Sequence, residues 1–259
     1  MKNLMIYISP TGSFDNPRPD LASNDAKVLS KVQIDNGIAL GWDREDIMLV
    51  TNFPYSYAGV QPIILADTPF FDRKPQVSKI NAIIRMFEEE LVKEGETYWF
   101  HDWDAFQLVP IEDSEIPIAE DEIAVTEYGG LMFRDMRRIS TGVIYFKSGS
   151  LDIFRRMKQL CYDKKIDEEE ALCLMVLEDE NIKKRVKILN YSYNFIGYSL
   201  RRCYKEAIKP LKVVHFHPLT GKRKLGTDNS LRFFKGDNHI QTQLITDRVV
   251  NILKDHGIT

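Results

Sequence analysis

The segment Tyr98-Trp99-Phe100-His101-Asp102-Trp103-Asp104 joins an apolar run to two carboxylates that stand one residue apart. Residues 78–93 before it have helical spacing and Gly95 follows them, so the run predicts a buried strand after a helix. Open α/β sheets bind ligands at the carboxyl ends of their strands, where Asp102 and Asp104 would lie. Carboxylate oxygens suit Mn²⁺ or Mg²⁺, so the pair predicts a metal site. A solvated loop is the alternative interpretation.

Strands and helices alternate on both sides of this segment. Apolar or β-rich runs predict strands, and a spacing near 3.6 residues predicts helices. Strands are expected at residues 4–9, 46–51, 60–65, 97–100, 123–126, 142–146, 186–189 and 212–216, and helices at 25–40, 78–93, 150–162, 168–178 and 239–254. The pattern predicts an α/β fold with a mixed, mostly parallel central sheet flanked by helices. Because no linker is evident, residues 1–259 are expected to form a single domain.

The composition is that of a globular protein with a sizeable core, since 44% of the residues are hydrophobic. No apolar run approaches the roughly 20 residues of a membrane helix, so no membrane span is expected. The three cysteines, Cys161, Cys173 and Cys203, have no metal-type spacing and cannot all pair. They predict reduced thiols in a cytoplasmic protein.

Two histidines near the carboxyl end are further candidate ligands. His215 and His217 lie two residues apart in an apolar run, so they would face the same side of a strand. A neutral imidazole can join carboxylates around a metal ion, although a satisfied core or edge histidine is the alternative. Lys222 follows Gly221 and begins a basic run. A histidine ligand followed by a Gly-Lys loop would suit a diphosphate.

The order of these motifs resembles that of the GT-A glycosyltransferases and is most similar to the glycogenin-like branch. After the Asp-x-Asp strand come Ser140-Thr141-Gly142-Val143-Ile144-Tyr145-Phe146, then Asp167-Glu168-Glu169, then Tyr191-Ser192-Tyr193-Asn194-Phe195, then Val214-His215-Phe216. The family has an Asn-x-Gly-Val-Met strand, an Asp-Gln helix start, a Tyr-Asn segment and a terminal His-Phe loop in this order. The likeness covers about residues 75–225.

The resemblance implies a Mn²⁺ or Mg²⁺ ion and a nucleotide-sugar donor, with a UDP-sugar favoured. It implies that Asp102, Asp104 and His215 hold the ion, and that Asp102 also contacts the donor. The other residues that match the family pattern are the donor-binding Lys79, Thr141, Gly142 and Lys222 and the catalytic Asp167 and Glu168 beside the reacting carbon.

Several of these matches have plainer alternatives or depart from the family. Lys79 could be a solvated helix residue, and acids at 167 and 168 are favoured at a helix start by the dipole alone. Glu168 stands where the family has glutamine, and no Pro-Trp follows Lys222. The pattern gives Arg137 and Arg138 no role.

The ends of the first two strands are expected to bind the nucleotide. Ser9 ends the first strand and Asn52 follows the second, so both would lie at the carboxyl edge of the sheet. Asn52 could contact a base edge while Phe53 or Tyr55 stacks on the base; an ordinary turn is the alternative. Residues 1–104 are therefore the expected nucleotide-binding half, and residues 105–259 the acceptor-binding half.

The charge distribution suggests a polyanionic acceptor. Residues 183–235 contain 14 Lys or Arg and two acids, a net +12, which leaves −15 elsewhere because the whole chain is −3. Aromatic residues interleave with these cations, as in a nucleic-acid groove. The opening loop and Thr51-Asn52-Phe53-Pro54-Tyr55 resemble phage glycosyltransferases, some of which modify hydroxymethylated pyrimidines. DNA is therefore the favoured acceptor. The alternatives are packing of the basic segment against the acidic remainder, and a glycan or lipopolysaccharide acceptor.

Two other functional classes share part of this pattern. A phosphatase of the haloacid dehalogenase type also ends a strand on Asp-x-Asp, but it needs Thr or Ser where this chain has Phe106, and it places the motif on its first strand. A non-catalytic nucleotide-binding module is the remaining alternative. In such a module the carboxylate pair would have no functional role.

Overall fold

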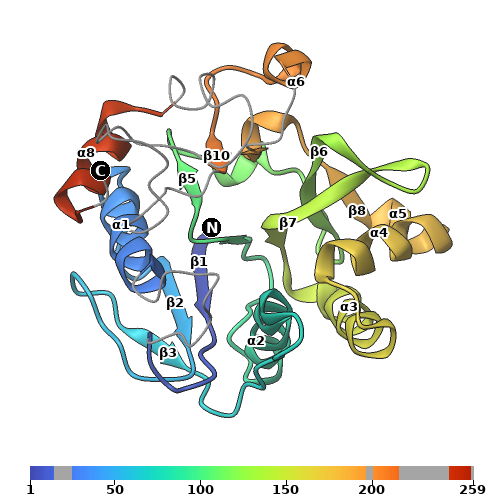
Figure 1. The fold of residues 1–259 in the computed structure, drawn as a ribbon, viewed down its shortest axis with the longest axis horizontal. Coiled ribbons are helices and arrows are strands. Elements are labelled where there is room, and N and C mark those ends of the chain that lie inside the picture. The colour runs from blue at the N-terminus through green and yellow to red at the C-terminus, as the bar shows by residue number, and fades with distance from the viewer. Residues whose placement is uncertain (15–24, 197–200, 216–244, 258–259) are drawn as a thin grey trace.

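A seven-stranded sheet forms the centre of the protein (Figure 1), in the order β3-β2-β1-β4-β7-β6-β8. The computed structural model describes residues 1–14, 25–196, 201–215 and 245–257. The strands are β1 (Lys2–Tyr7), β2 (Ile47–Thr51), β3 (Pro62–Ile64), β4 (Tyr98–His101), β6 (Ile123–Phe133), β7 (Met136–Phe146) and β8 (Val186–Ile188). Four of the six pairings are parallel, and β7 runs antiparallel to both neighbours. The mixed, mostly parallel sheet is therefore confirmed.

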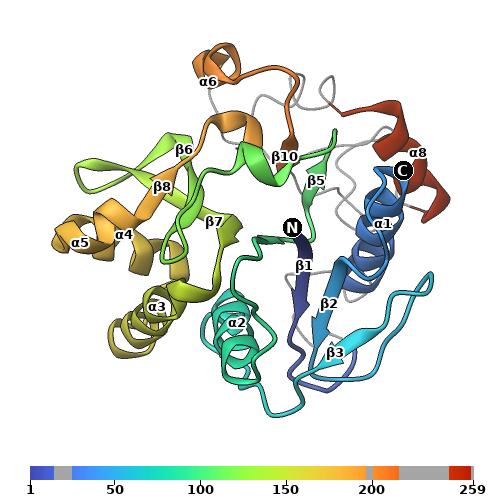
Figure 2. The same ribbon diagram turned by 180° about the vertical axis from the view of Figure 1, so that it is seen from behind.

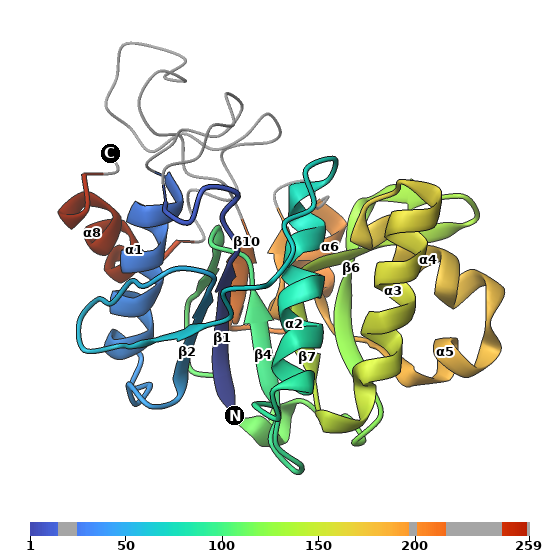
Figure 3. The same ribbon diagram turned by 90° about the horizontal axis from the view of Figure 1, so that it is seen from below.

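Helices cover both faces of this sheet (Figures 2 and 3). One face packs against α2 (Ser78–Glu88), α3 (Leu151–Lys164) and α4 (Glu168–Glu178). The other face packs against α1 (Asp25–Ala39), and α8 (Asp247–Asp255) lies beside α1. Two short helices, α5 (Glu180–Arg185) and α6 (Arg201–Glu206), were not expected from the sequence. No helix in the described ranges combines the length and apolar character that crossing a membrane requires.

β4 is apolar from Tyr98 to Phe100 because both of its faces are buried. Tyr98 and Phe100 of β4 point into the core under the helices, while Trp99 points into the opposite core. None of the three side chains is more than 1% exposed. Successive side chains of a strand alternate between faces, so a strand covered on both sides needs a continuous apolar run. This explains why the run before Asp102 was readable in the sequence.

A second, three-stranded sheet has the order β5 (Ala105–Gln107), β10 (Val213–His215), β9 (Phe195–Ile196). The strand at β10 was expected, but β5 and β9 are too short for a periodicity signal. β10 runs antiparallel to β5, and His215 pairs with Ala105. This register brings His215 next to the Asp-x-Asp segment.

The β6–β7 hairpin is much longer than the strands predicted at 123–126 and 142–146. Its register shifts: Ala124 pairs with Tyr145, but Thr126 pairs with Ser140. One residue of β6 thus opposes four of β7, and this part of β7 pairs with β4 on its other side, Val143 opposite His101. The irregularity lies at residues 141–144, at the carboxyl end of β4, and such bulges often lie next to active sites.

Candidate functional site

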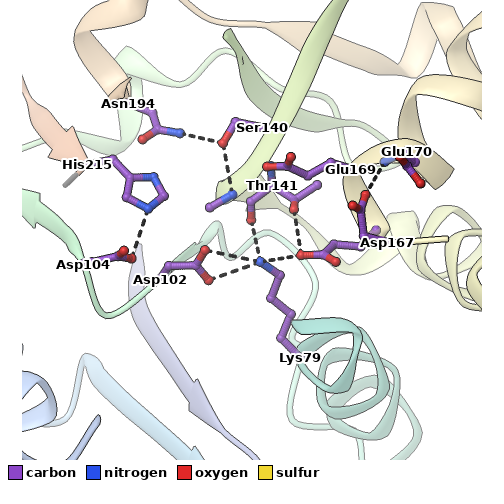
Figure 4. Close-up of polar contacts among 12 residues, drawn as sticks. Lys79, Asp102, Asp104, Ser140, Thr141, Asp167, Glu169, Glu170, Asn194 and His215 are labelled. Carbon is purple, nitrogen blue, oxygen red and sulfur yellow. Dashed lines mark hydrogen bonds and ion pairs between the residues drawn. The ribbon is translucent and has the colours of Figure 1, made fainter. Parts of the chain in front are cut away.

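Asp102 and Asp104 lie in the turn that joins β4 to β5 (Figure 4). The Asp102 N–H donates to the Gly142 carbonyl at 2.8 Å, and the Ala105 N–H donates to the Asp102 carbonyl at 3.0 Å. Since Ala105 pairs with His215, the turn places Asp104 against the imidazole, with Oδ1 3.0 Å from Nε2. Burial lowers the pKa of His215, but the Asp104 carboxylate outweighs it and raises the pKa above its ordinary value.

The three predicted metal ligands come together in the structure. Asp102, Asp104 and His215 each offer a ligand atom, and these atoms all lie within 4.8 Å of one another. Ligands at about 2.1 Å from one ion are separated by at most roughly 4 Å, so small side-chain rotations would close the site. The buried Nδ1 of His215 has no hydrogen-bond partner among the described residues. Two carboxylates and an imidazole therefore fit a Mn²⁺ or Mg²⁺ ion.

Gly142 makes room for the imidazole of His215. A Cβ at this position would lie 2.3 Å from His215 Cε1, 2.8 Å from its Nδ1 and 3.1 Å from Asp102 Oδ2. The first two distances are shorter than real Cβ contacts, so a side chain at position 142 would displace the imidazole. Thr141 and Gly142 thus form one wall of the candidate metal site.

A buried lysine links the metal ligands to α4. Lys79, in the first turn of α2, places Nζ 3.1 Å from Asp102 Oδ1 and 3.0 Å from Glu168 Oε1, and donates to the Thr141 carbonyl at 3.2 Å (Figure 4). The Thr141 hydroxyl donates to Glu168 Oε1 at 3.2 Å. Burial lowers the pKa of Lys79, but the two carboxylates raise it above its ordinary value, so the lysine stays charged. At 8% exposure Lys79 is not a solvated helix residue.

The two acids at the start of α4 occupy different environments. Asp167 is the N-cap residue, and its Oδ1 accepts the Glu170 N–H at 2.8 Å, as the helix-start alternative predicts. Glu168 instead points toward Lys79, and its side chain is 4% exposed. Its Oε2 is buried and has no partner among the described residues. Glu168, rather than Asp167, therefore belongs to the cluster around Asp102.

Ser9 and Asn52 lie after the neighbouring strands β1 and β2, at the same edge of the sheet. The Ser9 N–H donates to the Asn52 side-chain oxygen at 2.9 Å, and the Asn52 side-chain nitrogen donates to the Ser9 carbonyl at 2.8 Å. The pair holds the two loops together. Contact of either residue with a nucleotide stays a prediction, and Lys222 and His217 lie outside the described residues.

Part of the basic segment, residues 183–235, is neutralised by ion pairs within the fold. Four of its described cations, from α5, β8 and the residue before β10, form ion pairs at 2.6–2.9 Å. These pairs are Lys183–Glu180, Arg185–Asp152, Lys187–Glu122 and Lys212–Glu115. For these four cations, the structure agrees with the alternative that the basic segment packs against acidic residues of the same chain.

Sequence reasoning missed the residues that contact the neighbours of Glu168 and Thr141. Arg138 bonds Asp167 and Glu169, and Tyr128 donates to Glu169 at 2.7 Å. Asn194 is fully buried and donates to Ser140 at 3.2 Å, one residue before Thr141. The one available signal was the opposite charge of Arg138 and the acidic run at 167–170, which does not reveal that β7 and α4 are adjacent.

No family model and no curated protein matches the sequence. Among solved structures, galactosyltransferase LgtC in complex with donor and acceptor sugar analogues is 10% identical, with a TM-score of 0.50, over 83% of this chain and 86% of that one. A glycosyltransferase involved in glycosylation of the major capsid of PBCV-1 is 13% identical, with a TM-score of 0.50, over 83% and 93%. GlyE of Streptococcus pneumoniae TIGR4 is 11% identical, with a TM-score of 0.52, over 100% and 65%.

These likenesses show the fold. The chain has the α/β architecture of the GT-A type glycosyltransferases, as the order of its motifs predicts. Membership of the glycogenin-like branch stays a prediction.

Proposed function

We propose that this protein is a metal-dependent glycosyltransferase that moves a hexose from a nucleotide diphosphate sugar, with a UDP-sugar favoured, to a hydroxyl acceptor. One observation carries the proposal. The candidate ligand set Asp102, Asp104 and His215 is joined by the buried pair Lys79 and Glu168 in one cluster at the carboxyl end of β4. This is the edge at which open α/β sheets bind their ligands.

In the proposed reaction, the bond between the anomeric carbon and the diphosphate oxygen breaks, and a bond to the acceptor oxygen forms. The acceptor proton is lost to a base, and the nucleoside diphosphate leaves. A bound Mn²⁺ or Mg²⁺ ion would offset charge on the departing diphosphate. Asp102, Asp104 and His215 would hold that ion, and Lys222 is the further cation predicted to contact the diphosphate.

Lys79 and Glu168 would act on the sugar side of the site. The ammonium group of Lys79 binds both Asp102 and Glu168, so it fixes the distance between the metal ligands and the Glu168 carboxylate. Fixed groups of this kind contribute to catalysis because they need no reorganisation during the reaction. The buried Oε2 of Glu168 has no hydrogen-bond partner among the described residues, so it is the carboxylate oxygen that we assign to a donor or acceptor hydroxyl.

We favour a glycan hydroxyl as the acceptor, because the described cations give only weak support to a polyanion. The ion pairs of Lys183, Arg185, Lys187 and Lys212 reduce the cationic surface open to a polyanion. DNA remains the second candidate, supported by the basic and aromatic composition of residues 183–235.

The test is a donor screen with the purified full chain. UDP-glucose, UDP-galactose, UDP-GlcNAc and GDP-mannose are each offered with Mn²⁺, with Mg²⁺ or with a chelator, and with glycans, hydroxymethylated DNA or no acceptor. We expect metal-dependent release of nucleoside diphosphate that rises with one acceptor class. Release that rises with DNA would overturn the preference for a glycan.

Asp104→Asn separates an enzyme from a non-catalytic nucleotide-binding module. The variant should lose metal-dependent turnover, whereas Asp163→Asn, an exposed position on α3, should behave as wild type. Nucleotide binding without turnover in every condition would favour the binding module. The absence of both nucleotide binding and turnover would refute the proposal.

A further inference from the structure

Arg138 of β7 contacts the acids on both sides of Glu168. Its Nη2 donates to Asp167 Oδ2 at 2.9 Å, and its Nε donates to Glu169 Oε2 at 2.8 Å. The guanidinium therefore spans the first turn of α4, with one carboxylate before Glu168 and one after it. Planar guanidinium groups suit such two-point contacts, because their donors have a fixed spacing.

Glu169 connects this turn to two strands. Besides Arg138, its carboxylate accepts the Tyr128 hydroxyl at 2.7 Å and the Thr141 N–H at 3.3 Å. Thr141 is also the residue whose hydroxyl donates to Glu168. The contacts of Glu169 thus tie the start of α4 to the strand that lines the candidate metal site.

The charge of this turn needs a counter-charge. Residues 167–170 are four consecutive acids, and Glu168 already binds Lys79. Burial raises the pKa of Glu169, while Tyr128 and Arg138 act in the opposite direction. Arg138 is the cation that pairs with Asp167, Glu169 and Glu170 alike, at 2.9, 2.8 and 3.9 Å, so its loss would leave the repulsion among these acids without that counter-charge.

We propose that Arg138 is a positioning residue for the transfer reaction: it holds the first turn of α4 against β7 and thereby orients the Glu168 carboxylate toward Lys79 and Thr141. The inference rests on the proposed function, because it takes from that proposal that Glu168 takes part in the transfer. Arg138 itself has contacts with acids flanking Glu168 and is not assigned a contact with the substrate.

Arg156 provides a matched control. Its Nη1 bonds Asp179, the N-cap residue of α5, so it makes the same kind of contact at the start of a different helix. Substitution at this position should remove an arginine–N-cap pair without affecting Glu168. Arg138→Gln, Arg138→Lys and Arg156→Gln form the test set.

We expect Arg138→Gln to lower kcat by about 10- to 100-fold, since displaced supporting groups cost this much. The donor KM should change little, because the metal ligands remain. Arg138→Lys should recover part of the loss, since an ammonium group can contact one of the two carboxylates but cannot bridge them. Arg156→Gln should keep the wild-type kcat and KM. A wild-type kcat in Arg138→Gln, a rise in KM alone, or an equal loss in Arg156→Gln would each overturn the proposal.

Hydrogen exchange gives a readout that does not need activity. In Arg138→Gln the Glu170 amide, which Asp167 caps, should exchange faster, whereas Arg156→Gln should affect the Asn181 and Ile182 amides that Asp179 caps. If the wild type has no activity with any donor, the proposed function fails. The exchange data then still decide whether Arg138 orders this turn, and unchanged exchange at Glu170 would refute it.

Discussion

The imidazole of His215 lies against the backbone of Gly142, in space that a Cβ would occupy. That Cβ would be 2.3 Å from His215 Cε1. Because Asp104 bonds the same imidazole and Asp102 bonds the Gly142 carbonyl, the contact joins β7, the Asp-x-Asp turn and β10 at one point. The candidate metal site therefore depends on a residue that offers no ligand atom.

Gly142→Ala should weaken metal binding by displacing the imidazole. We expect the affinity for Mn²⁺ to fall by about 10- to 100-fold, measured by calorimetric titration of the metal-free protein. Gly37→Ala is the control: its nearest atoms are 3.4 Å or more from the new Cβ, and it lies in α1. That change should leave the affinity intact and stabilise the helix by about 0.5–1 kcal/mol. Wild-type Mn²⁺ affinity in Gly142→Ala would contradict this role.

Lys79→Met should destabilise the fold strongly. It leaves Glu168 buried with no counter-charge, so the free energy of unfolding should fall by about 3–5 kcal/mol. Lys79→Met combined with Glu168→Gln should recover much of that loss, because the unpaired charge is removed. Urea unfolding of both single variants and the double variant measures the coupling. A double variant no more stable than Lys79→Met would show that the pair is not the cause.

Stability should fall below about pH 6.5 through His101. Burial lowers the pKa of His101 to about 4, so the folded protein keeps it neutral while an unfolded chain protonates it near pH 6.5. The contribution of neutral His101 to the free energy of unfolding is complete above pH 6.5 and is lost as the pH falls toward 4. The slope of this free energy is at most about 1.4 kcal/mol per pH unit. Urea unfolding at several pH values, with a chelator present, should show this slope, and it should be reduced in His101→Asn. Equal slopes in the wild type and in His101→Asn would assign the acid sensitivity to other groups.

Arg248→Gln should loosen α8 from α1 and from the end of β5. The guanidinium donates to the side chain of Asn36 at 3.1 Å and to the carbonyls of Gln107 and Leu108 at 3.0 and 2.8 Å. Loss of these bonds should lower the free energy of unfolding by about 1–3 kcal/mol. Arg155→Gln removes a surface pair of a 57% exposed arginine and should cost less than about 1 kcal/mol. Equal costs in urea unfolding would show that α8 does not depend on this contact.

Elements with buried faces were predictable from the sequence. The strand before Asp102 is apolar from Tyr98 to Phe100 because both sides of β4 are covered, and α2, most of whose residues are buried, has helical spacing. The β6–β7 hairpin was underestimated because its outer half carries polar and exposed residues, and its pairing is set by the partner strand. Strands as short as β5 and β9 leave no periodic signal.

The sequence by itself determined the chemistry of the site: two carboxylates after an apolar strand, an imidazole near the carboxyl end, and a lysine in a helix. Only the tertiary structure decided which of these groups meet. His215 reaches Asp104 across 111 residues because β10 pairs with β5, and Glu168 reaches Lys79 because α4 packs on β7 beside α2. Local periodicity reports which side of a strand or helix is buried, but pairing between distant strands depends on cooperative packing of the whole core. The same reason hid Arg138, whose partners lie some 30 residues further along the chain.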